Sequence, residues 1–175
     1  MSSTTPAPAR HFVTVKAAVW DGDRLLLMRE DAGEGQVAVD LPGGRLEEDE
    51  SLEQGLRREI REELGVELAR LAALPTKLWS TRTVDGIGVV GILYEAALAS
   101  LSFDHAGAAE ILGAAFFSYE ELLAAHCGVH KPFIVEYFAA RLTPEGPGAR
   151  SADSPTDPAP RKRHAVARAA RRSRA

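Results

Sequence analysis

The stretch GRLEEDESLEQGLRREIREELGV, residues 44–66, decides what this chain of 175 residues folds into. Ser51 is followed three residues later by Gln54, a capping-box pattern that predicts a helix N-terminus. We expect the helix to run to about Leu64 and to stop at Gly65, because glycine is favoured just beyond a helix C-terminus. The stretch therefore predicts a loop followed by one helix.

Three glutamates of this helix share one face, because Glu59, Glu62 and Glu63 are spaced i, i+3 and i+4. At about 100° per residue, this face lies roughly a quarter turn from the apolar stripe, at the edge of the buried side. The stripe consists of Leu52, Leu56, Ile60 and Leu64. Clustered carboxylates repel one another unless a cation holds them, and their hard oxygens suit Mg²⁺ or Mn²⁺. Considered alone, the cluster leaves open an ordinary solvated helix with i, i+4 ion pairs.

Residues 44–66 resemble the Nudix box without a gap. The box is a Gly, five residues, a Glu, seven residues, then Arg-Glu-aliphatic-any-Glu-Glu-any-Gly-aliphatic. The matching positions are Gly44, Glu50, Arg58, Glu59, Ile60, Glu62, Glu63, Gly65 and Val66. A chance match of seven identities is on the order of one in 10⁸ per start position. A looser resemblance covers about residues 12–142, and one departure is Asp49, where many relatives have glycine.

The resemblance implies an enzyme that uses Mg²⁺, with Mn²⁺ as a substitute, to hydrolyse the diphosphate linkage of a nucleoside diphosphate joined to another group. Arg58 is expected to orient the carboxylates by charge-assisted hydrogen bonds, and Glu50 to support the helix start. The implied metal ligands are the carboxylates of Glu59, Glu62 and Glu63 and the backbone carbonyl of Gly44.

Four residues outside the box are further candidates. Many family members have a glutamate in the loop of Glu110 that assists metal binding or acts as the base, and a solvated loop glutamate is an equal alternative. Trp79 and Arg82 are candidates for substrate binding by stacking and phosphate pairing, although core packing and surface solvation are favoured for them. Arg29, at the end of the second expected strand, is a weaker phosphate-binding candidate.

The remaining pattern predicts an α/β fold. Two apolar runs around Asp21-Gly22-Asp23 predict a hairpin. Helices interleave with strands while several strand pairs look antiparallel, which indicates a Nudix-type α/β/α sandwich with a mixed β-sheet. The expected strands are 12–20, 25–28, 37–41, 66–74, 77–83 and 86–98, and residues 116–118 are expected to lie in a further strand that follows Glu110. The further helices are 119–125 and 133–142.

Composition divides the chain into a leader at 1–10, a Nudix domain at 11–142 and a basic Pro/Ala/Arg-rich tail at 143–175, with both ends expected to be disordered. The tail has eight basic and three acidic residues, a charge of +5, so residues 1–142 carry −9. Nucleic acid is therefore not an expected partner. A single cysteine and the lack of a long apolar run favour a cytoplasmic protein that does not enter membranes.

The expected partner is a small nucleotide, with a homodimer left open. A nucleoside triphosphate and an ADP-sugar type of substrate both remain, because neither family subclass mark stands at residues 81–84. The alternative function is a non-catalytic Nudix-fold domain for nucleotide binding or regulation. Such domains usually lose box glutamates, whereas this chain keeps them all.

Overall fold

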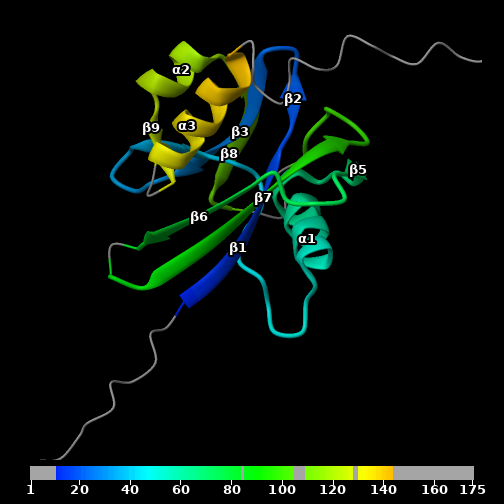
Figure 1. Ribbon diagram of the computed structural model, residues 1–175. Coiled ribbons are helices and arrows are strands. Elements are labelled where there is room, and N and C mark those ends of the chain that lie inside the picture. Colours follow the sequence, from blue (N-terminus) through cyan, green and yellow to red (C-terminus); the bar gives the residue numbers. More distant parts are fainter. Residues whose placement is uncertain (1–10, 84, 105–108, 128–129, 144–175) are drawn as a thin grey trace, which may run out of the picture.

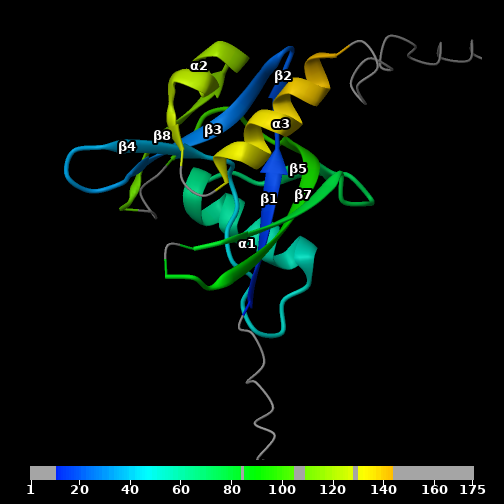
Figure 2. The same ribbon diagram turned by 60° about the vertical axis from the view of Figure 1, so that its left-hand side comes forward.

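The computed structural model places the strands between two helical layers. Helix α1 (Leu52–Leu64) lies on one side of the strands, and helices α2 (Tyr119–Ala124) and α3 (Lys131–Leu142) lie on the other (Figures 1 and 2). This arrangement confirms the α/β/α prediction. The expected leader and, apart from Thr143, the expected tail lie outside the described residues. The structure describes residues 11–83, 85–104, 109–127 and 130–143.

The first sheet is built on β7 (Gly88–Leu98). Strand β1 (His11–Ala18) pairs with β7 in parallel, and β6 (Lys77–Arg82) and β5 (Leu68–Leu71) pair with it antiparallel. The sheet is therefore mixed, as predicted. Strand β5 is shorter than the expected strand 66–74, because it pairs only with the last residues of β7.

The second sheet is built on β3 (Arg24–Asp31), which confirms the predicted hairpin by pairing antiparallel with β2 (Trp20–Asp21). Strand β4 (Val37–Asp40) and strand β8 (Ile111–Phe117) pair antiparallel with the two edges of β3. Strand β8 begins directly after Glu110 and includes Phe116 and Phe117, which were expected to lie in a strand. The short strand β9 (His126–Cys127), which pairs with β4 in parallel, was not predicted, because two residues show no periodicity.

Strand β3 is buried on both faces. Leu26 and Met28 belong to the apolar cluster that contains Ile60 of α1, while Leu25 and Leu27 belong to the cluster around α3. All four side chains of the run are fully buried. Because neither face meets water, the run is continuously apolar and not alternating.

Helix α1 begins and ends as the sequence predicts. The Gln54 N–H donates to Ser51 Oγ at 3.3 Å and the Ser51 N–H donates to Gln54 Oε1 at 2.9 Å, so both bonds of the capping box are present. Gly65 closes the helix with φ of 66° and donates its N–H to Arg61 O at 3.0 Å. No helix in the described ranges is long and apolar enough to cross a membrane.

The segment 42–46 connects β4 to the turn before α1 and runs along the outer edge of β1. It is held there by backbone hydrogen bonds of ladder type. As a result, the segment brings β1, β4 and the glutamate face of α1 together. The bonds join Ala17 N to Pro42 O at 2.8 Å, Val15 N to Gly44 O at 2.9 Å and Leu46 N to Val13 O at 3.0 Å.

Candidate active site

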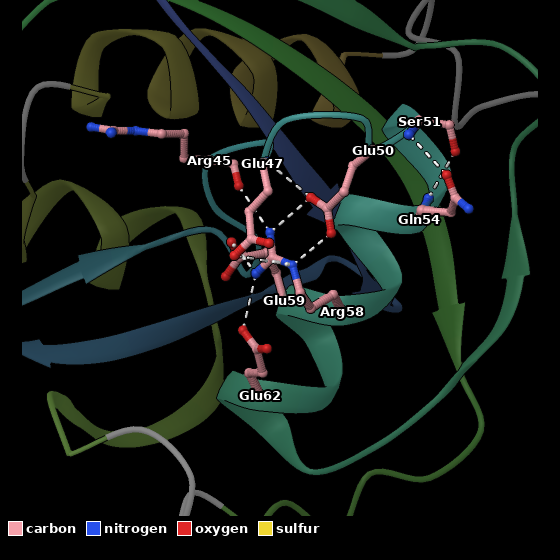
Figure 3. A network of polar contacts seen from close by, with 8 residues as sticks. All are labelled: Arg45, Glu47, Glu50, Ser51, Gln54, Arg58, Glu59 and Glu62. Carbon is pink, nitrogen blue, oxygen red and sulfur yellow. Dashed lines mark hydrogen bonds and ion pairs between the residues drawn. The ribbon is translucent and has the colours of Figure 1, made fainter.

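The guanidinium of Arg58 gathers the box carboxylates (Figure 3). Its Nε and Nη2 donate to the two oxygens of Glu50 at 2.7 and 3.0 Å, a bidentate pair. Its Nη1 donates to Glu59 Oε1 at 2.9 Å and to Glu62 Oε2 at 3.0 Å. Nη2 also donates to the backbone carbonyl of Arg45 at 3.0 Å, while the Arg45 side chain points away. One cation thus contacts three box glutamates.

Electrostatics agrees with this geometry. The Arg58 guanidinium and then the Glu47 N–H hold the pKa of Glu50 at about 2, so Glu50 stays ionised. The pKa of Arg58 is raised in turn, first by its hydrogen bond to Glu50. The turn before Glu50 is formed by Asp49, whose φ of 68° is in the left-handed region. Glycine adopts this conformation more readily than aspartate does.

We expect Arg58→Lys to destabilise the metal-free protein by about 1–3 kcal/mol, because an ammonium cannot make the bidentate pair and the other bonds together. The measurement is urea unfolding without added metal. Arg57→Lys is the matched control, since Arg57 contacts the exposed Glu53 and Leu68 O. Equal losses in the two variants would contradict the organising role of Arg58.

Two glycines place backbone against the glutamates. Gly43 N–H donates to Glu63 Oε2 at 2.7 Å. Gly44 approaches the carboxylate of Glu59 so closely that a Cβ on Gly44 would lie 2.6 Å from its carbon. Burial raises the pKa of Glu63 to about 7, against the opposing effects of Lys16 and the Gly43 N–H. The site thus concentrates negative charge where water is partly excluded.

The carbonyl of Gly44 is already hydrogen-bonded. It accepts from Val15 N and from Thr14 Oγ1, each at 2.9 Å. Two donors occupy its two lone pairs. Metal binding by this oxygen would require the Thr14 hydroxyl to turn away, and the role assigned to Gly44 by resemblance stays a prediction.

Sequence reasoning missed a buried ion pair beside these glutamates. Lys16 of β1 is only 6% exposed, and its Nζ lies 2.9 Å from Asp40 Oδ2 of β4. Burial lowers the pKa of Lys16, but the charges of Asp40 and Glu63 outweigh it, so the pKa is raised and Lys16 is a cation. The signal that could have revealed the pair is the lysine inside the apolar run FVTVKAAVW, because a lysine in a buried strand needs a partner of opposite charge.

Glu110 precedes β8 and accepts a hydrogen bond from Asp31 N at 2.9 Å through its backbone oxygen. Its exposed carboxylate acts on Glu30, whose pKa is raised by burial and then by Asp40 and Glu110. Glu30 in turn contributes to the raised pKa of Glu63. Glu30, which the sequence did not suggest, therefore lies within electrostatic reach of both Glu110 and Glu63.

The three predicted substrate-binding residues are not gathered beside the glutamates. Trp79 stacks on Phe133 at 3.8 Å and donates to His130 Nδ1 at 3.1 Å. Its ring also packs against Gly91, so ring faces that a base would need are occupied. Its remaining surface lines a pocket of about 380 Å³ between β6 and α3. Trp79 therefore serves mainly in packing.

Arg82 and Arg29 are both exposed. Arg82 donates to Gly86 O within the β6–β7 hairpin. Arg82 and His11 pair with Gly88 of β7 from its two sides, so Arg82 lies level with the start of β1. Lys16 lies five residues along β1 from His11, about 17 Å of strand. Arg29 lies on the opposite face of β3 from Glu30, because successive strand residues alternate. Phosphate binding by either arginine stays a prediction.

The donor set fits a divalent cation by its chemistry. Glu59, Glu62 and Glu63 offer the hard oxygens that a divalent cation prefers. Burial is the largest cause of the raised pKa of Glu63, and the charges of Glu59 and Glu30 add smaller contributions. In the part of the chain that the structure describes, no three His, Cys, Asp or Glu side chains already converge as a metal site. Arg58 holds Glu59 and Glu62, whereas Glu63 is bonded to Gly43.

A family model, the NUDIX domain, matches residues 10–137 of this chain. The chain belongs to the Nudix family. The matched range includes the complete box at residues 44–66 and the Arg58 network. No curated protein matches the chain.

Solved Nudix structures share the fold. A NUDIX hydrolase from Nitrosomonas europaea is 25% identical with a TM-score of 0.64, covering 75% of this chain and 90% of that one. The Escherichia coli ORF135 protein is 24% identical with a TM-score of 0.64, covering 83% and 96%. The NUDIX domain of Shewanella oneidensis NrtR, determined with ADP ribose, is 21% identical with a TM-score of 0.58, covering 78% and 90%.

The protein is thus a Nudix hydrolase, an enzyme of the pyrophosphohydrolase class that acts on nucleoside diphosphate derivatives. The family generally uses a divalent metal and binds small nucleotides. The homodimer and the cytoplasmic location stay predictions.

Proposed function

We propose that this Nudix hydrolase uses Mg²⁺ to cleave the diphosphate linkage of a nucleoside triphosphate or an ADP-sugar type of substrate. The observation that supports the proposal most is the Arg58 network, which aligns Glu59 and Glu62 on one face of α1 beside Glu63. An ADP-sugar is compatible with the ADP ribose bound by the NrtR domain, a protein of the same fold.

Each residue has a separate task in this proposal. Glu59, Glu62 and Glu63 offer carboxylate oxygens to Mg²⁺, and Arg58 limits the directions in which Glu59 and Glu62 point. When bound, a divalent cation neutralises the diphosphate and activates water. Glu110 is the candidate base, because its exposed carboxylate is free of the Arg58 network and acts on the site through Glu30.

The chemistry predicts where the oxygen of water goes. In ¹⁸O water with Mg²⁺ and a nucleoside diphosphate joined to a sugar, the label is expected on phosphorus of one product. Glu59, Glu62 and Glu63 would hold a divalent cation against the phosphate oxygens, and a water activated by that cation would attack phosphorus. The measurement is mass spectrometry of both products.

The control reaction contains a chelator in place of Mg²⁺ and is expected to show no turnover. Label on a carbon of the sugar would contradict attack on phosphorus. Undiminished turnover without divalent metal would contradict the role of Mg²⁺.

A further inference from the structure

Placing the ion pair of Lys16 and Asp40 in the interior of a small domain is unfavourable in free energy, because both charges lose their hydration. The side chains are only 7% and 16% exposed. Withdrawing two charges from water costs several kcal/mol, and replacing a buried ion pair with apolar residues is often neutral or stabilising. Stability alone therefore does not account for a lysine in the middle of β1.

The contacts of Lys16 show what the pair holds. Besides Asp40, Nζ donates to the backbone oxygen of Leu41 at 2.9 Å. Leu41 leads directly into the Pro42-Gly43-Gly44 turn, whose Gly43 N–H is bonded to Glu63. Asp40 is itself fixed, because its Oδ1 accepts from Leu41 N at 2.8 Å. The pair thus anchors the entry of the turn that touches the metal-binding glutamates.

The charge of Lys16 also acts on Glu63 directly. It lowers the pKa of Glu63 and is the largest influence that opposes burial. Asp40 is the closer partner and engages the ammonium at 2.9 Å. Without the carboxylate of Asp40, the ammonium would be balanced by Glu63 instead. It would then compete with a divalent cation for the same oxygens.

We propose that Lys16 and Asp40 are positioning residues: their ion pair fixes the Leu41–Gly44 turn and keeps Lys16 from neutralising Glu63, so that Glu63 remains available to metal. This inference rests on the proposed metal-dependent function. Neither residue is catalytic, because Lys16 is buried, Asp40 is largely covered, and both act through the turn and through Glu63.

The first test replaces the pair with apolar residues, combining Lys16→Met with Asp40→Leu. We expect this double variant to be at least as stable as the wild type in urea, since no buried charge of the pair remains unpaired. Its Mn²⁺ affinity, measured by the electron paramagnetic resonance of free Mn²⁺, is expected to fall about 10- to 100-fold. If the pair served only stability, the Mn²⁺ affinity of this stable double variant would equal that of the wild type.

The second test is Asp40→Asn, which keeps the volume of the side chain and removes only its charge. Its Mn²⁺ affinity is also expected to fall about 10-fold or more, because Lys16 is left facing Glu63. In the metal-free protein, the amide proton resonance of Gly43 should shift, since it reports the bond to Glu63. At saturating Mg²⁺, the KM for nucleotide should stay near the wild-type value.

The matched control is the exposed ion pair of Arg24 and Glu121, which lie 2.8 Å apart. Glutamine at both positions removes the charges, and glutamine at 121 can still complete the capping box of α2. This control is expected to keep the wild-type Mn²⁺ affinity. An equal loss in the control would overturn the proposal, because any ion pair would then have the same effect.

The remaining outcomes are also decisive. A wild-type Mn²⁺ affinity in Asp40→Asn overturns the positioning role, whatever the Gly43 resonance does. Failure of both variants to fold overturns it too, because the pair would then serve the fold as a whole. A wild type that binds no Mn²⁺ and hydrolyses no nucleotide contradicts the proposed function itself, which separates the two failures.

Discussion

Replacing Glu63 with glutamine is expected to lower kcat by at least on the order of 10²-fold while the protein stays folded. Glutamine has nearly the same volume and its amide oxygen can still accept the Gly43 N–H. It lacks the negative charge that we propose for metal binding. The measurement is turnover at saturating Mg²⁺ together with the circular dichroism spectrum.

Glu53→Gln is the control for this substitution. Glu53 lies on the same helix, is exposed, and contacts Arg57 at 2.9 Å and not the box network. Its turnover should match that of the wild type. Near-wild-type turnover of Glu63→Gln at saturating Mg²⁺ would remove Glu63 from the metal ligands.

The same variant tests the electrostatics without metal. Burial raises the pKa of Glu63 from 4.5 to about 7, against Lys16 and the Gly43 N–H and with the charges of Glu59 and Glu30. For a carboxyl whose pKa is raised on folding, stability is fully present below the unfolded value and is lost as the pH rises through the folded value. Metal-free wild type should therefore lose stability between about pH 4.5 and pH 7 relative to Glu63→Gln.

The size of this loss has an upper bound of about 3 kcal/mol, because one pKa unit corresponds to about 1.36 kcal/mol. Urea unfolding of both proteins at pH 5 and pH 8 with a chelator measures it. Parallel stability profiles of wild type and Glu63→Gln would show that Glu63 does not carry the raised pKa.

The second large effect concerns Gly43, whose replacement by alanine is expected to cost about 3 kcal/mol or more. The φ of this residue is 116°, a conformation that alanine rarely adopts. A Cβ would also lie 2.3 Å from the backbone oxygen of Val15. The backbone of β1 cannot easily move aside, because it is hydrogen-bonded to β7 on one side and to segment 42–46 on the other. Thermal and urea unfolding measure the loss.

Substitutions at two other glycines separate the backbone strain from the steric clash. Gly22→Ala has a positive φ of 60° but open space around it, so it measures backbone strain alone. In Gly44→Ala, the obstacle is the carboxylate of Glu59, the end of a flexible side chain. We expect Gly44→Ala to keep most of its stability and to lose activity. Equal stability of Gly43→Ala and Gly22→Ala would show that the 42–44 turn shifts to accommodate the Cβ of alanine without further loss.

The sequence allowed the local elements to be predicted because their signals are local. The capping box of Ser51 and Gln54, the stop at Gly65 and the buried stripe of α1 depend on residues within one helix. The hairpin of β2 and β3 depends on a short turn between apolar runs. The short strand β9 could not be predicted, because it depends on pairing with a distant strand.

For the active site, the sequence by itself determined the family and the box carboxylates, because helical spacing alone puts Glu59, Glu62 and Glu63 on one face. Only the tertiary structure decided what surrounds them. It buried Lys16 against Asp40, engaged the Gly44 carbonyl with Thr14, and covered the ring of Trp79. Burial and hydrogen-bond partners arise from residues far apart in the chain, and they set the charge and orientation of a side chain whose identity the sequence already gives.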